Sequence, residues 1–186
     1  MKTQTLILSL ILLPTLLLSQ NIFDKYEDMD QVSSVIVNEK MFKMLADVET
    51  NDPDSGAFIS QAKMLKNLTV FTTSSLDVTN SIEKDVASYI ESSKLEELMR
   101  IKDGASSIKF FILEGSDDNH VIELLMFVKG LTEMTQDRNF SVNGKQLEIE
   151  TVLLSLKGNI DLREVSKLTA KLNVPGGELL KNATKE

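Results

Sequence analysis

The sequence predicts a two-layer α+β sandwich, in which one mixed, mostly antiparallel sheet of about six strands carries its helices mainly on one face. Three observations predict this fold class. Apolar residues alternate with other residues in four successive segments, as half-buried strands require, at 97–102, 107–113, 121–128 and 148–157. Two earlier strands are expected at 31–37 and 68–73. A helical period of apolar residues, typical of a helix packed on a sheet, occupies 77–92.

The four late strands form a predicted meander, because short turn segments separate the first three. Asp103-Gly104 and the segment 115–119 are rich in residues that tolerate the backbone angles of a reversal. One parity of each strand is apolar and is expected to face the core. These residues are Met99, Ile101, Ile108, Phe110, Ile112, Ile122, Leu124, Met126, Val128, Val152, Leu154 and Leu156.

The N-terminus has the composition of a secretory signal peptide. Lys2 supplies the positive charge, a mostly apolar run follows at 6–18, and small or polar residues come next at Ser19 and Gln20. The run is shorter than the roughly 20 residues that a membrane span needs. We therefore expect residues 1–20 to be removed near position 20, which leaves residues 21–186 as one α+β domain.

Charge and cysteine content exclude several classes of function. The chain has 28 acidic and 20 basic residues, a net charge of −8, which disfavours binding to nucleic acid or to anionic lipid surfaces. It contains no cysteine, so disulfides, thiol nucleophiles and thiolate metal sites are excluded. A lipoprotein signal also needs a cysteine, and we expect no lipidation.

The first half of the domain alternates strands and helices. A short helical turn is expected at 21–30, followed by the strand 31–37, which is apolar on both sides and therefore suits the interior of a sheet. Asn38 is suited to cap a helix whose expected buried face is Met41, Met44, Leu45 and Val48. A second helix is predicted at 57–66. These helices favour a crossover that makes the first two strands parallel.

The second half adds a connector and a last helix. The connector 131–146 contains Asn143-Gly144, the strongest short-range hairpin signal in the chain. The last strand is expected to end at Gly158. Asp161 and Glu164 have the spacing of a capping box for a helix that carries Leu162, Val165, Leu168 and Leu172.

Residues that could carry chemistry are few. The single histidine, His120, follows Asp117, Asp118 and Asn119 in a predicted turn, where such residues are ordinary and seldom converge on one metal ion. No nucleophile elbow, phosphate-binding loop, dinucleotide fingerprint or zinc-protease motif is present. We therefore predict no catalytic residue, no metal site and no cofactor.

The opposite face of the meander is more apolar than a face open to water would be. It carries six apolar side chains: Leu98, Phe111, Leu113, Leu125, Phe127 and Leu153. Two interpretations remain open. Either residues 130–146 or the N-terminal segment fold over this face, or the six residues form an interaction face for a protein partner or a second copy of the chain.

Several segments resemble, taken together, a bacterial envelope family known as domain of unknown function 4252. They are FDKYEDMDQVSSVIVNEKMFKML (23–45), EELMRIKDG (96–104), ELLMFVKG (123–130) and LLSLKGNIDLREVSKLTAKLNVPGGELL (153–180). The resemblance implies export, a single α+β domain, no assigned activity, and a gene neighbourhood of extracytoplasmic sigma factors. It supplies no catalytic or ligand residues.

The sequence thus favours an exported, non-catalytic protein that acts as an interaction or regulatory module of the bacterial cell envelope, in the periplasm, at the outer membrane or outside the cell. The alternative is a small-ligand carrier or hydrolase-like enzyme with a pocket between sheet and helices. Such an enzyme would use scattered acids, or Tyr89 and His120. Its ionisable side chains would have to converge in one cleft.

Overall fold

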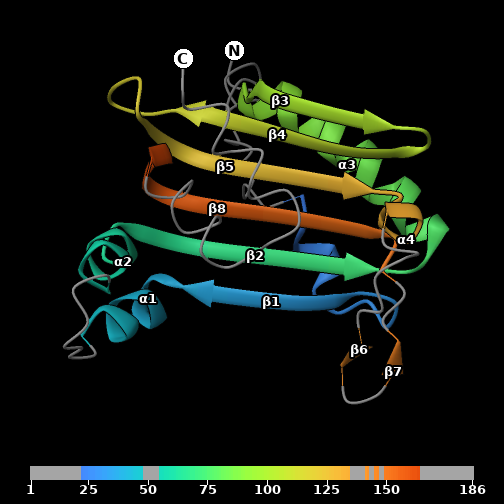
Figure 1. Cartoon of the computed structure of the whole chain (residues 1–186), viewed down its shortest axis with the longest axis horizontal. Helices are drawn as coiled ribbons and strands as arrows, with labels where there is room; N and C mark the ends of the chain where they lie inside the picture. The colour runs from blue at the N-terminus through green and yellow to red at the C-terminus, as the bar shows by residue number, and fades with distance from the viewer. Residues whose placement is uncertain (1–21, 48–54, 135–140, 143–144, 147–148, 164–186) are drawn as a thin grey trace, which may run out of the picture.

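A computed structural model describes residues 22–47, 55–134, 141–142, 145–146 and 149–163 of the chain. Its main sheet is antiparallel throughout, with the strand order β1-β2-β8-β5-β4-β3 (Figure 1). The strands are β1 (Ser33–Asn38), β2 (Leu65–Thr73), β3 (Glu96–Asp103), β4 (Ser106–Glu114), β5 (His120–Lys129) and β8 (Thr151–Asp161). The helices are η2 (Asp24–Tyr26, a 3-10 turn), α1 (Glu39–Ala46), α2 (Ser55–Ala62), α3 (Leu76–Ser93) and α4 (Leu131–Met134).

The predicted α+β sandwich is confirmed. The long helix α3 lies behind the sheet, and α1 and α2 lie beyond one end of β1 and β2 (Figure 1). The prediction of a parallel pair was wrong, because β1 and β2 pair antiparallel. The helices α1 and α2 of this connection lie at one end of the sheet and do not cross a sheet face (Figure 1). A parallel pair would need such a crossing.

The strand β1 lies at the edge of the sheet, which corrects the prediction that it is interior. Five of its six residues are exposed. Apolar residues on both sides of a strand are typical of burial on both faces, but here they leave Val35 and Ile36 open to solvent.

Both faces of the sheet carry buried apolar clusters. The first cluster lies between the sheet and α3: Phe23, Tyr26, Phe71, Val78, Ile82, Val86, Leu95, Phe111, Leu125, Phe127 and Leu153. The second lies on the other face: Ile108, Phe110, Val121, Leu124, Val128 and Ile160. Most of the predicted core parity belongs to the second cluster or packs against it. Ile122 is exposed instead, because the register shifts between Val121 and Glu123.

The helix α3 follows its predicted period. Val78, Ile82 and Val86 are buried, and Tyr89 and Ile90 pack against the same cluster. The helix begins where the Ser75 hydroxyl accepts a hydrogen bond from the Val78 amide, a standard N-cap. It ends at Lys94, which takes a left-handed conformation (φ 56°).

The predicted turns and caps are largely present. Gly104 takes the positive φ of a reversal, and the Asn38 side chain accepts a hydrogen bond from the Met41 amide at 3.1 Å. The hairpin in the connector is confirmed, since β6 (Ser141–Val142) pairs with β7 (Lys145–Gln146). The last strand continues beyond Gly158 to Asp161. Asp161 accepts a hydrogen bond from the Arg163 amide, and the rest of the predicted helix lies outside the described residues.

Candidate functional site

The predicted interaction face belongs to the protein's own core. Phe111, Leu125, Phe127 and Leu153 are buried in the first cluster, and Leu113 packs against it. Of the six residues, Leu98 alone is exposed, at a register shift in β3. The prediction that this face docks a partner is therefore corrected. The other interpretation, a face covered by the chain itself, agrees with the structure.

The covering elements are α3 and the N-terminal residues around η2. The rings of Phe23 and Tyr89 lie 4.9 Å apart, and the Tyr26 hydroxyl donates a hydrogen bond to Asp85 of α3. Burial and the neighbouring Asp85 carboxylate raise the pKa of Tyr26. Lys25 forms an ion pair with the same carboxylate at 2.6 Å. Leu131, the first residue of the connector, does not cover this face, because it packs against the second cluster.

A buried polar network lies under α3. Glu123 is only 4% exposed. Its carboxylate accepts hydrogen bonds from Ser155 (2.8 Å) and Tyr89 (2.9 Å). Lys157 donates to the Tyr89 hydroxyl at 2.9 Å and lies 3.6 Å from Glu123. Each of these polar groups has a hydrogen-bond or ion-pair partner within the network. The network can therefore hold α3 on the sheet.

Protonation within this network follows from burial and neighbouring charge. Burial raises the pKa of Tyr89, and the Glu123 charge adds to the rise, while Lys157 opposes it. Burial lowers the pKa of Lys157, but Tyr89 and Glu123 outweigh this effect and the net pKa is raised. The arrangement therefore favours a protonated Tyr89 beside a charged Lys157.

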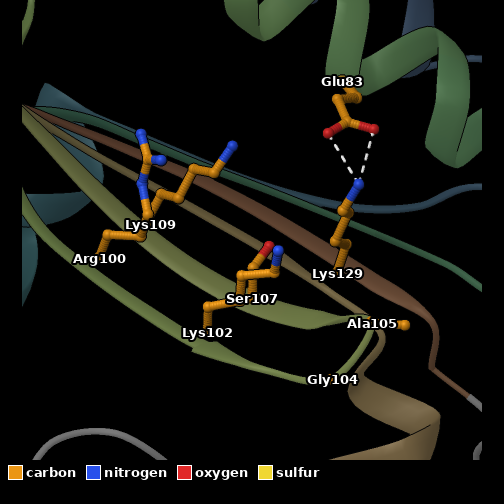
Figure 2. Close-up of a pocket in the computed structure, with 8 residues that line it drawn as sticks. All are labelled: Glu83, Arg100, Lys102, Gly104, Ala105, Ser107, Lys109 and Lys129. Atoms are coloured by element: carbon orange, nitrogen blue, oxygen red, sulfur yellow. Dashed lines mark hydrogen bonds and ion pairs between the residues drawn. The ribbon is translucent and has the colours of Figure 1, made fainter.

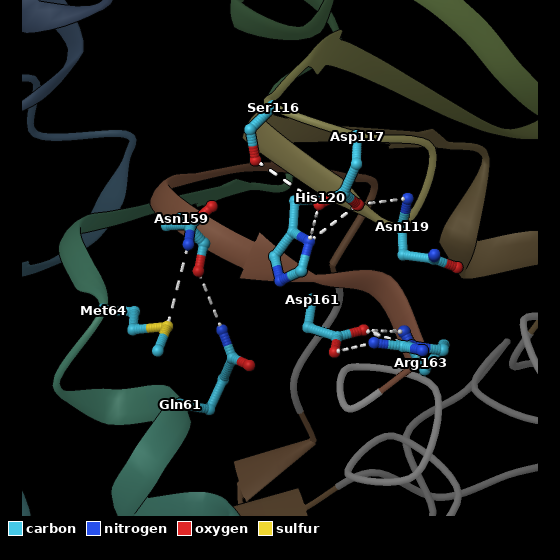
Figure 3. Close-up of polar contacts among 9 residues, drawn as sticks. All are labelled: Gln61, Met64, Ser116, Asp117, Asn119, His120, Asn159, Asp161 and Arg163. Carbon is cyan, nitrogen blue, oxygen red and sulfur yellow. Dashed lines mark hydrogen bonds and ion pairs between the residues drawn. The ribbon is translucent and has the colours of Figure 1, made fainter.

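His120 takes a different set of partners at the start of β5. Its Nδ1 lies 2.8 Å from Asp117 Oδ1 (Figure 3), and His120 holds the pKa of the Asp117 carboxyl below its usual value. Nearby, Arg163 lowers the pKa of Asp161 to about 2. The enzyme alternative would use Tyr89 and His120 together. The two side chains instead hydrogen-bond to separate groups. Within the described residues, no three histidine or acidic side chains gather into a metal-binding group.

A cleft that sequence reasoning missed lies on the α3 face, near the β3 edge of the sheet. It encloses about 390 Å³, and we call it the basic cleft (Figure 2). Its charged and polar lining consists of Arg100, Lys102, Ser107, Lys109, Lys129 and Glu83. Lys129 reaches up from β5 to the Glu83 carboxylate on α3, at 2.8 and 2.9 Å.

The opposite edge of the sheet exposes apolar side chains. Val35 and Met44 are 56% and 59% exposed. We call the sheet edge that carries Val35, Ile36, Met41, Met44 and Leu45 the β1–α1 surface; all five are exposed, and Val35 and Ile36 point to opposite faces of the sheet. The prediction that Met41, Met44 and Leu45 lie on the buried face of α1 was therefore wrong. Phe42 and Ala46 are buried in their place, while Val48 lies outside the described residues.

One known protein family matches most of the chain. The model of the family described as domain of unknown function (DUF4252) matches residues 26–168, a range that contains all six strands of the main sheet. The chain belongs to the DUF4252 family. The resemblance drawn from the sequence is thereby confirmed. Neither the curated proteins nor the solved structures compared with this DUF4252 chain gave a match.

Within the described residues, no helix combines the length and apolar composition that crossing a membrane requires.

The sequence contained one sign of the basic cleft, since Arg100, Lys102 and Lys109 alternate with apolar residues on two adjacent strands. Only the register shows that these cations share a face with Lys129.

Proposed function

We propose that this DUF4252 protein is an exported, non-catalytic interaction module of the bacterial cell envelope. Its β1–α1 surface binds an extended, apolar segment of a partner protein, which adds a strand beside β1. The observation that carries the proposal is the chemistry of β1. It is an edge strand of six uncharged residues, Ser33–Asn38, with exposed valine and isoleucine at its centre.

The other edge of the sheet provides the contrast. The strand β3 carries Glu96, Glu97, Arg100, Lys102 and Asp103, and its register shifts between Glu97 and Met99. Charges and bulges protect an edge from pairing with another chain. The strand β1 has neither of these features, so its outer hydrogen-bonding groups suit strand addition.

The helix α1 extends this apolar surface beyond the strand. Met41, Met44 and Leu45 have the i, i+3, i+4 spacing that places side chains together on a helix. Methionine is flexible and polarisable, so it adapts to the surface of a partner. The first residues of α1 directly follow β1, and a segment paired with β1 therefore lies near this group.

The non-catalytic part of the proposal rests on the use of the reactive groups. Ser155 and Tyr89 donate to Glu123, and His120 is paired with Asp117. Ser155 and Glu123 are only 5% and 4% exposed, so this hydroxyl and its carboxylate are closed off from a substrate. The ligand-carrier alternative draws its support from the basic cleft, which lies at the other edge of the sheet.

Cross-linking in cells tests the partner site. A photoreactive side chain at position 35 is expected to cross-link to one protein, whereas the same group at Leu98, an exposed apolar position on the charged edge, is not. Ile36→Lys should abolish that cross-link, since it adds a charge to the edge. Lys40→Gln on exposed α1 is the matched control and should leave it unchanged.

Two outcomes would contradict the binding mode. Cross-linking that is equal at positions 35 and 98, or that survives Ile36→Lys, would reject strand addition at β1. A cross-link to the protein itself would identify the partner as a second copy. Ile36 is exposed, so the lysine variant should change the free energy of unfolding by no more than about 0.5 kcal/mol.

Export has a separate test. The proposal predicts that the native protein begins near residue 21, because the composition of residues 1–20 is that of a signal peptide. N-terminal sequencing of protein purified from its natural host measures the start directly. A protein that begins at Met1 would reject the export proposal and leave the partner site untouched.

A further inference from the structure

The basic cleft concentrates positive charge on a chain whose net charge is −8. In the register of the sheet, Arg100 lies directly opposite Lys109. Lys102 lies opposite Ser107, which lies in turn opposite Lys129. Like charges directly opposite on adjacent strands destabilise a sheet. Arg100 and Lys109 therefore repel each other, and an anion bound between them would relieve this repulsion.

Ser107 lies at the centre of this arrangement and is 6% exposed. Its hydroxyl is the one buried side-chain oxygen or nitrogen atom, among the described residues, without a hydrogen-bond partner. The adjacent Ser106 hydroxyl donates to the Gly130 carbonyl at 2.8 Å. Because a buried hydroxyl without a hydrogen-bond partner destabilises the fold, Ser107 points to a ligand that accepts its hydrogen bond.

Some of the cations of the cleft have an ion-pair partner and others have none among the described residues. Lys129 is paired with Glu83, and Arg100 with Glu97. Lys102 and Lys109 form no ion pair with any residue that the structure describes. Two unpaired ammonium groups, a guanidinium and a free hydroxyl donor thus line the same volume, where they can converge on one oxyanion.

We infer that the basic cleft binds a phosphate group, either as free phosphate or as the monoester of a small molecule. A phosphate has enough acceptor oxygens to take hydrogen bonds from several strands at once, whereas a carboxylate has two. The volume of about 390 Å³ lies within the range of small-molecule sites, roughly 300–1,000 Å³. The inference is independent of the partner site, because β1 and β3 are opposite edges of the sheet.

Isothermal titration calorimetry of the purified protein tests the site with inorganic phosphate, glycerol 3-phosphate, glycerol and acetate. Both phosphates should bind, and glycerol and acetate should not. Tighter binding of glycerol 3-phosphate would identify a phosphomonoester as the ligand, and equal or tighter binding of inorganic phosphate would identify the free anion. Absence of phosphate binding, or equal binding of acetate, would overturn the inference.

Variants place the binding in the cleft. Lys102→Gln with Lys109→Gln should weaken phosphate binding at least tenfold, whereas Lys40→Gln on α1 is the control and should not change it. Ser107→Ala separates binding from folding. It should weaken phosphate binding several-fold while the melting temperature stays the same or rises, because the unpaired hydroxyl is removed. Unchanged phosphate affinity in both cleft variants would overturn the assignment.

Discussion

We expect the double substitution Phe111→Asp and Phe127→Asp to unfold the protein. Both side chains are buried between the sheet and α3, where an unpaired carboxylate is strongly disfavoured. The loss of two phenyl groups from the core costs about 3–5 kcal/mol each. Together these terms approach or exceed the whole stability of a typical domain, roughly 5–15 kcal/mol. Circular dichroism should show the loss of cooperative melting.

A matched control separates core burial from the chemistry of aspartate. Leu98→Asp places the same charge on the same sheet at an exposed position, and it should melt within a few degrees of the unchanged protein. Self-association or partner binding should also survive in this control. A double variant that stays a folded monomer would show that the six residues form a surface, as one of the two sequence-based interpretations held.

The alternation of residues predicted two apolar faces of the sheet, but it could not show which face the rest of the chain covers. Alternation places Phe111 and Phe127 on one side and Phe110 and Met126 on the other, and both sides are apolar. The choice depends on contacts between distant segments, such as the hydrogen bond from Tyr26 to Asp85. Period and propensity report local structure, so they cannot specify which face a remote segment covers.

The errors at β1 and α1 have the same origin. The strand β1 pairs with one side of β2, and β8, which is remote in sequence, pairs with the other side. This order leaves β1 at the edge of the sheet. The helix α1 has two candidate apolar stripes, and its packing at the end of the sheet buries the one with Phe42 and Ala46. The basic cleft likewise depends on register, because Lys102, Ser107 and Lys129 come from three strands.

The substitution Glu123→Ala is expected to destabilise the protein by about 2–3 kcal/mol. It removes the acceptor for Tyr89 and Ser155 and the charge next to Lys157. Breaking a buried pair costs about 3–5 kcal/mol, but about a third of the Lys157 side chain is exposed, which lets the ammonium turn to water and reduces the loss. Urea denaturation measures the change in the free energy of unfolding.

The control for this substitution is Glu123→Gln, which keeps the shape and an acceptor oxygen but removes the charge. It should cost less than the alanine variant. Glu83→Ala, which breaks an ion pair that is more exposed, should cost less than about 1 kcal/mol. If all three variants were equally stable, the network under α3 would contribute nothing to the attachment of the helix.

The same network predicts an alkaline limit to stability. The pKa of Tyr89 is raised in the folded protein, so its contribution is fully present below its unfolded pKa of about 10 and is lost as the pH rises through the folded value. Glu123→Gln removes the Glu123 charge that supports this rise, leaving the opposing effect of Lys157. We therefore expect the pKa of Tyr89 to fall. In a Tyr26→Phe background, ultraviolet titration of the remaining tyrosine measures the shift. An unchanged pKa would show that Glu123 does not act on Tyr89 through its charge.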